Sequence, residues 1–399
     1  MWEVFLARAI RREAAGHLFT VHLPSGRVLR PSTGAETPFE VALHGKDAAR
    51  RLCLNPPLAF GELYTEGKIE LLRGELVEVI EALLPPRGGP SAPTRRFSRW
   101  RNPPETSRHN VEHHYDLGND FYRLFLDEDL QYSCAYWGPG VRTLEEAQEA
   151  KKRHIAEKLL IKPGMRVLDV GCGWGGMALT LARDYGAEVT GITLSPSQLA
   201  HAEARAERAG LSGRVRFLLT DYREIEERFD RVVSVGMLEH VGPRDLPVYF
   251  RRLAQLLEPD GAALVHSIGR AGPPRQTSPW IKKYIFPGGH LPALSDLASP
   301  LESSGLWLTD LEVLRLHYAK TLRAWRERFE QHADHIEREK GEDFVRLWRF
   351  YLCGSEAAFT AGDQVVFQLQ LAASREVVPL TRDYLYTDKV PEASGAEAA

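Results

Sequence analysis

The sequence predicts an α/β protein in which a doubly wound parallel sheet follows a smaller N-terminal α+β domain. From Thr143 onward, short apolar strands alternate with amphipathic helices, as they do in consecutive βαβ units. A glycine-rich turn at 171–176 joins the first of these strands to a helix, at the carboxyl edge where such sheets bind ligands. The first 84 residues follow a different pattern.

Residues 1–84 predict a domain of their own. Residues 19–23 alternate between apolar and polar side chains, and the turn Pro24-Ser25-Gly26 leads from them into a second short apolar run. This pattern is typical of a hairpin. Apolar residues recur at helical spacing over 71–84 and stop at Pro85, which predicts a helix that ends there.

A linker is predicted over residues 85–108, which are rich in proline, glycine and arginine and contain one acidic residue, Glu105. Two interpretations stay open for this linker. It is either a solvated tether or a basic surface that faces anionic lipid, where each arginine contributes about 1 kcal/mol. The second domain is predicted over 109–388, and the small and polar residues 389–399 predict a disordered tail.

The second domain is predicted to contain at least five strands with helices between them. The predicted strands are 166–170, 188–193, 215–219, 231–235 and 262–268. Two helices are predicted over 144–161 and 177–185. A third is capped by Ser195, with Pro196 at its first position and Gly210 after its end.

Composition and charge exclude several classes of protein. The chain has 399 residues and a formal net charge of −3, so no overall positive field favours nucleic acid. No apolar run approaches the roughly 20 residues that span a bilayer, and charged residues interrupt the first 15 positions, unlike a signal peptide. The four cysteines are widely spaced and form no CxxC pair, which is typical of a reducing compartment. We therefore expect a cytoplasmic protein whose contact with a membrane is peripheral.

The stretch LDVGCGWGG at 168–176 follows a predicted strand and opens a helix. Its glycines allow the backbone to approach a ligand, and the start of the helix offers free N–H groups. A dinucleotide site would require an acidic residue about 20 positions after such a glycine turn, and the sequence has none there. A dehydrogenase is therefore disfavoured. The pattern Asp-x-Gly-x-Gly instead resembles motif I of the class I S-adenosylmethionine methyltransferases.

Eight stretches, taken in order, resemble the cyclopropane fatty acid synthase and mycolic acid cyclopropane synthase family. They are HHYDLGNDFYRLFL, YSCAYW, LDVGCGWGG, GITLSPSQ, DRVVSVGMLEHVG, HSIG, PGGHLP and HYAKTL. The resemblance runs from about His109 to Tyr386, and residues 1–84 look like the extra domain of the branch that modifies phospholipids. It implies a class I methyltransferase fold, S-adenosylmethionine as cofactor, and the cis double bond of an unsaturated phospholipid acyl chain as substrate.

The resemblance also implies which residues contact the cofactor. Carried over motif by motif, they are Tyr132, Ser133, Gly171, Gly173, Thr193, Gln198, Asp221 and Tyr222. Members of the family often have a tryptophan at the last of these positions. Tyr222 would stack on the adenine in the same way, with a smaller area of contact.

A bound bicarbonate is the second group that the resemblance implies, as the base that removes a proton from the new methyl group so that the ring closes. The residues that would hold it are Cys134, Glu239, His266, Ile268 and Tyr318. Cys134 and Ile268 would act through backbone N–H groups, and the other three through side chains. Glu239 and His266 each follow an apolar strand, which agrees with the gathering of ligands at the carboxyl ends of parallel strands.

Three other interpretations stay open. A related lipid methyltransferase would make methyl-branched or methylene fatty acids, a small-molecule methyltransferase would use another substrate, and a non-catalytic protein would only bind lipid. The extra N-terminal domain argues against the second, and the full set of site residues argues against the third. His113 and His114 have no carboxylate at helical spacing and no third ligand in view, so no metal site is predicted. The family suggests transient contact with the inner face of the membrane and a homodimer.

Overall fold

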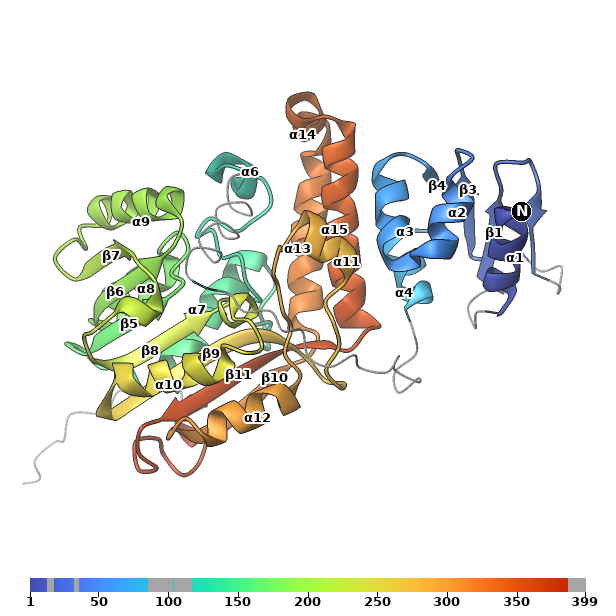
Figure 1. Cartoon of the computed structure of the whole chain (residues 1–399). Coiled ribbons are helices and arrows are strands. Elements are labelled where there is room, and N and C mark those ends of the chain that lie inside the picture. Colours follow the sequence, from blue (N-terminus) through green and yellow to red (C-terminus); the bar gives the residue numbers. More distant parts are fainter. Residues whose placement is uncertain (13–17, 32–35, 85–102, 104–116, 387–399) are drawn as a thin grey trace, which may run out of the picture.

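The computed structural model describes residues 1–12, 18–31, 36–84, 103 and 117–386. Nearly all of the predicted linker, the pair His113 and His114, and the predicted tail lie outside the described residues. In Figure 1 the N-terminal unit stands beside a larger α/β unit, and the long helices α13 (His317–Gln331) and α15 (Glu342–Thr360) lie between their sheets. None of the described helices is both long and apolar enough to cross a membrane.

The N-terminal unit, residues 1–84, contains a four-stranded sheet of order β2-β1-β3-β4. Its strands are β1 (Phe19–His22), β2 (Val28–Leu29), β3 (Phe39–Leu43) and β4 (Ile69–Arg73), and its helices are α1 (Trp2–Arg12), α2 (Ala48–Leu54), α3 (Pro56–Thr65) and α4 (Leu76–Leu83). The antiparallel pairing of β1 with β2 confirms the predicted hairpin. β1 also pairs with β3, in parallel.

The helix predicted over 71–84 is wrong in its first part. Residues up to Arg73 belong to β4, which pairs antiparallel with β3 and places Leu71 opposite Val41. Gly74 follows with a φ of +93°, a left-handed conformation that glycine adopts without penalty, and α4 begins at Leu76. The spacing of apolar residues within 71–84 carries no information about strand pairing, because the partner of Leu71 lies 30 residues earlier in the chain.

The larger unit is built on a seven-stranded sheet of order β10-β11-β9-β8-β5-β6-β7. The strands are β5 (Arg166–Val170), β6 (Glu188–Thr193), β7 (Val215–Leu219), β8 (Phe229–Val235), β9 (Leu257–Arg270), β10 (Trp307–Leu314) and β11 (Gln364–Ala372). β5 to β9 confirm the five predicted strands and are parallel to their neighbours among them. β11 is antiparallel to both β9 and β10, so the sheet is mixed and not parallel throughout.

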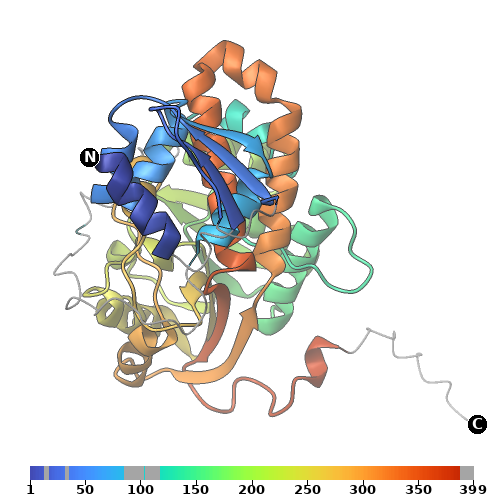
Figure 2. The same cartoon turned by 90° about the vertical axis from the view of Figure 1, so that its right-hand side faces the viewer.

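Helices cover both faces of the large sheet, as expected for a doubly wound fold (Figures 1 and 2). α7 (Leu144–Lys158), α8 (Gly176–Tyr185) and α9 (Pro196–Arg208) pack on one face, and α10 (Leu246–Leu256) and α12 (Leu294–Glu302) pack on the other. The Oγ of Ser195 accepts from the N–H of Gln198, which confirms the predicted cap of α9. α7 ends before the predicted Ile161, because Leu160 takes a left-handed φ of +53°.

An aromatic cluster covers the carboxyl end of the parallel strands. It joins α6 (Asn119–Arg123) and the chain that follows it to α11 (Pro279–Tyr284), α13, α14 (Ala333–Lys340) and α15. Its buried rings are Phe121, Tyr122, Phe125, Trp174, Trp280, Tyr318, Trp325, Phe329, Trp348, Tyr351 and Phe359. These rings exclude water from the edge of the sheet where the site lies.

The two units share a packed interface between α15 and α11 of the larger unit and α3 and α4 of the smaller one. The rings of Trp280 and Phe350 pack edge to face over Gly61 of α3, with 4.7 Å between ring centroids. A Cβ atom at Gly61 would lie 2.5 Å from Trp280 and 2.6 Å from Phe350. The carboxylate of Glu62 accepts from Lys283 at 2.7 Å and from Tyr284 at 2.9 Å, so polar contacts rim this interface.

Candidate active site

A cavity of about 150 Å³ lies at the carboxyl ends of β5, β6, β7 and β8. All eight residues predicted to contact the cofactor line this cavity: Tyr132, Ser133, Gly171, Gly173, Thr193, Gln198, Asp221 and Tyr222. They come from four separate segments of the chain, which the fold brings to one place. Their contacts with a ligand stay a prediction.

The glycine turn after β5 forms the floor of this cavity. Gly171 and Gly173 have φ values of +81° and +54°, a region that other residues rarely adopt. The N–H groups of Gly171 and Cys172 both donate to the carbonyl of Ile192 in β6, at 3.0 and 2.9 Å. A Cβ atom at Gly171 would lie 3.3 Å from Met237. Glycine therefore keeps the turn close to both neighbouring strands and leaves room for a ligand.

A hydroxyl and an amide stand where a dinucleotide site would have an acidic residue. Thr193 Oγ1 donates to Gln198 Oε1 at 2.9 Å and accepts from the N–H of Ser195 at 3.1 Å. Both side chains are buried. Because the amide oxygen of Gln198 is engaged, its nitrogen is the part that remains to donate toward a ligand in the cavity.

Asp221 and Tyr222 occupy the end of the cavity beyond β7. The carboxylate of Asp221 accepts from the backbone N–H of Arg223 at 3.0 Å and from its guanidinium at 2.7 Å. The ring of Tyr222 is buried and packs edge to face on Tyr249, with 5.5 Å between ring centroids. Asp221 is thus held in place by its neighbour, and Tyr222 has a fixed orientation in the cavity wall.

Asp169 also lines the cavity, although it was absent from the predicted site residues. It is buried, and its Oδ2 has no hydrogen-bond partner among the described residues. Burial raises the pKa of this carboxyl to about 7, and the charge of Lys151 opposes that change. The first position of the Asp-x-Gly-x-Gly pattern was the signal that would have identified it.

Glu239 lies in the short helix η3 (Leu238–His240), just beyond β8. The backbone N–H of Ile268 donates to its Oε1 at 2.6 Å, and its Oε2 has no hydrogen-bond partner among the described residues. Burial raises the pKa of this carboxyl to about 7, which the hydrogen bond from Ile268 only partly offsets. A carboxyl in this state exchanges a proton near neutral pH.

His266 lies within β9, not at the end of a strand as the sequence suggested, because β9 continues to Arg270. It is nevertheless the last residue of β9 that pairs with β8. Its Nδ1 lies 3.1 Å from the amide nitrogen of Gln368, so Nδ1 accepts and Nε2 carries the proton. Nε2 has no partner among the described residues. Burial lowers the pKa of His266 well below its usual value, so the ring is neutral.

Gln368 is therefore a site residue whose role the sequence did not reveal. It is fully buried on β11, directly opposite His266 in the antiparallel register with β9. Its amide fixes which ring nitrogen of His266 carries the proton. Only the register between two distant strands places it there, so no local pattern could have identified it.

Cys134, Ile268 and Tyr318 meet in or against the aromatic cluster. Burial raises the pKa of the Cys134 thiol, so it is a protonated packing group and not a thiolate. The ring of Tyr318 packs against Trp325 and Phe359. The backbone N–H of Ile268 was expected to face a bound anion, but in the structure it donates to Glu239. The hydrogen bond from Ile268 to Glu239, together with this cluster, connects four of the five predicted residues, and His266 lies two residues before Ile268 on β9.

Comparisons with known proteins identify the family. Residues 103–369 match the mycolic acid cyclopropane synthetase family. A probable fatty acid methyltransferase of Pseudomonas putida is 39% identical over 344 residues, which cover 82% of this chain and 86% of that protein. The cyclopropane-fatty-acyl-phospholipid synthase of Escherichia coli strain K12 is 45% identical over 258 residues, which cover 64% of this chain and 66% of that protein.

Among solved structures, a mycolic acid cyclopropane synthase in complex with SAH and CTAB superposes with a TM-score of 0.62 and 33% identity. The superposition covers 66% of this chain and 98% of the other. The chain therefore belongs to the mycolic acid cyclopropane synthetase family and is an S-adenosylmethionine-dependent methyltransferase.

Proposed function

We propose that the protein converts the cis double bond of an unsaturated phospholipid acyl chain into a cyclopropane ring. The observation that carries this proposal is a pair of buried atoms, Glu239 Oε2 and His266 Nε2, which have no hydrogen-bond partner among the described residues. Both lie where β8 and β9 end their pairing, beside the aromatic cluster. Ring closure requires removal of a proton from the new methyl group, which is the task of such a pair.

We infer that a small oxyanion would bind between these groups. A bound S-adenosylmethionine supplies a methyl group on a sulfonium, and a bound bicarbonate would supply the base. The neutral ring of His266 would donate through Nε2–H, and Tyr318 would donate through its hydroxyl. Glu239 would exchange a proton with the anion, since its pKa of about 7 is near neutral pH. Ile268 would position Glu239 through the 2.6 Å hydrogen bond.

The aromatic cluster suits the charge that develops on the acyl chain. A double bond that accepts a methyl cation becomes positively charged, and aromatic faces stabilise a cation by about 0.5–2 kcal/mol each. The rings also exclude water, which would otherwise add to the charged carbon. Tyr132 and Trp325 stack at 5.1 Å, and the hydroxyl groups of Tyr132 and Tyr351 are 2.8 Å apart, so the cluster is continuous with the cofactor cavity.

The N-terminal unit is the part that would contact the membrane. Large apolar side chains at Met1, on α1 and at the end of α2 are open to solvent, with exposed fractions of 92% for Met1, 49% for Phe5 and 67% for Leu54. Trp2 lies beside Phe5, with 6.0 Å between ring centroids. Such a surface favours the boundary between lipid headgroups and acyl chains.

A second product is favoured by the name of one relative. The Pseudomonas putida protein is described as a probable fatty acid methyltransferase, with no mention of a ring. If the cation lost a different proton, the same site would yield a methylene chain, and a methyl-branched chain would further require a hydride from an external donor. The test must therefore distinguish these products.

The test is incubation of the protein with S-adenosylmethionine, bicarbonate and vesicles of unsaturated anionic phospholipid. Mass spectrometry and proton NMR of the recovered acyl chains identify the product. A gain of one CH₂ with cyclopropane signals and no alkene signal supports the proposal. The same gain with a remaining double bond, or a gain of CH₂ and two further hydrogens with a methyl branch and no alkene signal, supports the second product. No change in the acyl chains, with S-adenosylmethionine still bound, would contradict the lipid substrate.

Glu239→Gln is the matching variant, because it keeps the shape of the side chain and removes the exchangeable proton. We expect turnover to fall by about 100- to 10,000-fold, the usual contribution of a positioned acid or base, while the affinity for S-adenosylhomocysteine is retained. Glu226→Gln removes an exposed carboxylate and serves as the control. Sedimentation of the same vesicles tests membrane contact: protein in the pellet supports it, and product formed by protein that stays in the supernatant contradicts it.

A further inference from the structure

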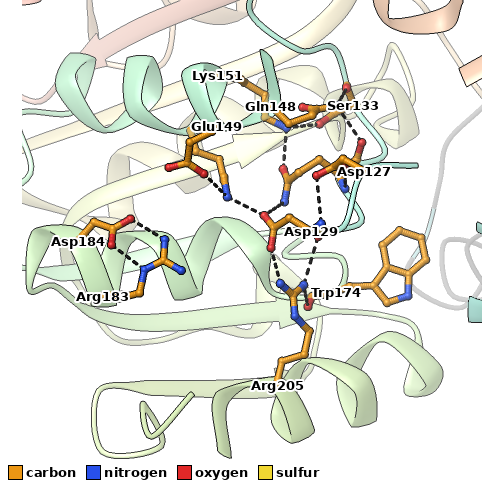
Figure 3. A network of polar contacts seen from close by, with 12 residues as sticks. Asp127, Asp129, Ser133, Gln148, Glu149, Lys151, Trp174, Arg183, Asp184 and Arg205 are labelled. Carbon is orange, nitrogen blue, oxygen red and sulfur yellow. Dashed lines mark hydrogen bonds and ion pairs between the residues drawn. The ribbon is translucent and has the colours of Figure 1, made fainter. Parts of the chain in front are cut away.

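A fully buried lysine lies directly behind the wall of the cofactor cavity. Lys151 of α7 is 0% exposed, and its Nζ donates to Gln131 Oε1 at 2.6 Å and to Ser133 Oγ at 2.8 Å (Figure 3). Gln131 and Ser133 both line the cavity. Both acceptors are neutral, and Lys151 forms no ion pair with any of the described residues, which is unusual for a buried cation.

Two carboxylates near Lys151 are occupied by other donors, whereas Asp169, on which the charge of Lys151 also acts, has an Oδ2 without a partner among the described residues. Asp127 accepts from the N–H groups of Asp129 and Gln131. Asp129 accepts from Lys152, from Arg205 and from the amide nitrogen of Gln131. Burial lowers the pKa of Lys151 to about 8, and the charges of Asp127 and Asp129 oppose that change while the charge of Lys152 adds to it.

The chemistry of an ammonium group sets the direction of these hydrogen bonds. An ammonium can only donate, so the oxygens of Gln131 and Ser133 must accept. The amide of Gln131 is then fixed at both ends, because its nitrogen donates to Asp129 at 3.0 Å. The proton of the Ser133 hydroxyl must point away from Lys151. Ser133 is thereby prepared to donate to an acceptor in the cavity.

The rest of the network holds this arrangement against the glycine turn. Arg205 of α9 donates to the carbonyl of Trp174 at 2.9 Å and to the carbonyl and carboxylate of Asp129 (Figure 3). The segment that carries Gln131 and Ser133 is thus tied to the turn that forms the cavity floor. A hydroxyl donor and a buried positive charge therefore have a fixed position relative to the cofactor cavity.

We propose that Lys151 is a positioning residue for the cofactor, which holds Ser133 as a hydrogen-bond donor and supplies the positive charge that attracts the α-carboxylate of S-adenosylmethionine. The α-carboxylate is the anionic group of that molecule. The sulfonium and the α-ammonium are cations, which a buried lysine repels. Lys151 thus favours one orientation of the cofactor, whichever lipid is methylated.

The test compares two ligands by calorimetry. S-adenosylhomocysteine keeps the α-carboxylate, whereas 5′-methylthioadenosine lacks the whole amino-acid part. We expect Lys151→Met to lower the affinity for S-adenosylhomocysteine by about 10- to 100-fold, the value of a hydrogen bond to a charged group. The affinity for 5′-methylthioadenosine should change by less than about 3-fold. If the α-ammonium of the ligand lay near Lys151 instead, removal of the lysine would strengthen binding. A loss of affinity for S-adenosylhomocysteine alone therefore indicates that the α-carboxylate lies near Lys151.

Two further variants keep the test decisive. Lys152→Met removes the neighbouring buried cation, which pairs with Asp129 and Glu149. It should change the affinities for both ligands by the same factor. Ser133→Ala leaves every charge in place and should again lower the affinity for S-adenosylhomocysteine but not for 5′-methylthioadenosine. This variant tests the proposal even if Lys151→Met does not fold. An equal loss for both ligands in Lys151→Met, or an unchanged affinity of Ser133→Ala for S-adenosylhomocysteine, would overturn the proposal.

Discussion

The two halves of the candidate active site satisfy their polar groups to different degrees. On the cofactor side, Thr193 bonds Gln198 and Arg223 bonds Asp221, and Asp169 is the exception, because its Oδ2 has no partner among the described residues. On the other side, Glu239 and His266 each keep one buried atom without a partner among the described residues. Buried polar atoms without partners cost about 1–3 kcal/mol each. The first half is built to be rigid, and the second half holds groups ready for a proton.

The largest effect that would test this contrast is a dependence of stability on pH. The pKa of Glu239 is about 7 in the folded protein and 4.5 when unperturbed. As pH rises from about 4.5 to 7, the unfolded chain releases this proton while the folded protein keeps it, so stability falls. The loss reaches about 3 kcal/mol above pH 7. Urea unfolding of the wild type and of Glu239→Gln, in bicarbonate-free buffer between pH 5 and 8, measures it.

The comparison with the variant isolates Glu239 from Asp169, whose pKa is also about 7 and whose contribution has the same sign. The difference in unfolding free energy between the wild type and Glu239→Gln should change with pH over this range and level off above it. Two curves that stay parallel from pH 5 to 8 would mean that Glu239 ionises in the folded protein as it does in water.

A smaller effect is expected from the amide that orients His266. Gln368→Leu removes the donor to Nδ1, and we expect kcat to fall by about 10-fold, the value of one buried hydrogen bond, with no change in affinity for S-adenosylhomocysteine. Gln370→Leu, two residues along the same strand, removes an amide that bonds Lys158 and Tyr384 instead, and serves as the control. Equal losses of kcat and affinity in Gln368→Leu would point to a general disturbance of the sheet.

The smallest effect is expected on the rigid side. Tyr222→Ala removes a ring from the cavity wall, and an aromatic contact contributes about 0.5–1.5 kcal/mol. The affinity for S-adenosylhomocysteine should therefore fall by about 2- to 12-fold, whereas kcat at saturating cofactor should be retained. Tyr222→Trp should bind at least as tightly as the wild type. A loss of kcat in Tyr222→Ala without a loss of affinity would place this ring on the proton-handling side.

The same contrast explains how much of the site could be predicted from the sequence. The strands β5 to β9, the cap at Ser195 and the glycine turn depend on neighbouring residues, and the sequence predicted each of them. Gln368 faces His266 across 102 positions, through an antiparallel register that no local pattern encodes. Lys151 was hidden for the same reason, since its partners lie 18 and 20 positions away on another segment.

Gly61 shows that the two units have been fitted to each other. A glycine inside a helix costs about 1 kcal/mol relative to alanine, yet any side chain here would collide with Trp280 and Phe350 of the larger unit. The smaller unit therefore accepts a weaker helix in return for close approach to its neighbour. It is not an interchangeable module, and a chimera that joined the N-terminal unit of a relative to this catalytic unit would need a residue equally small at this position.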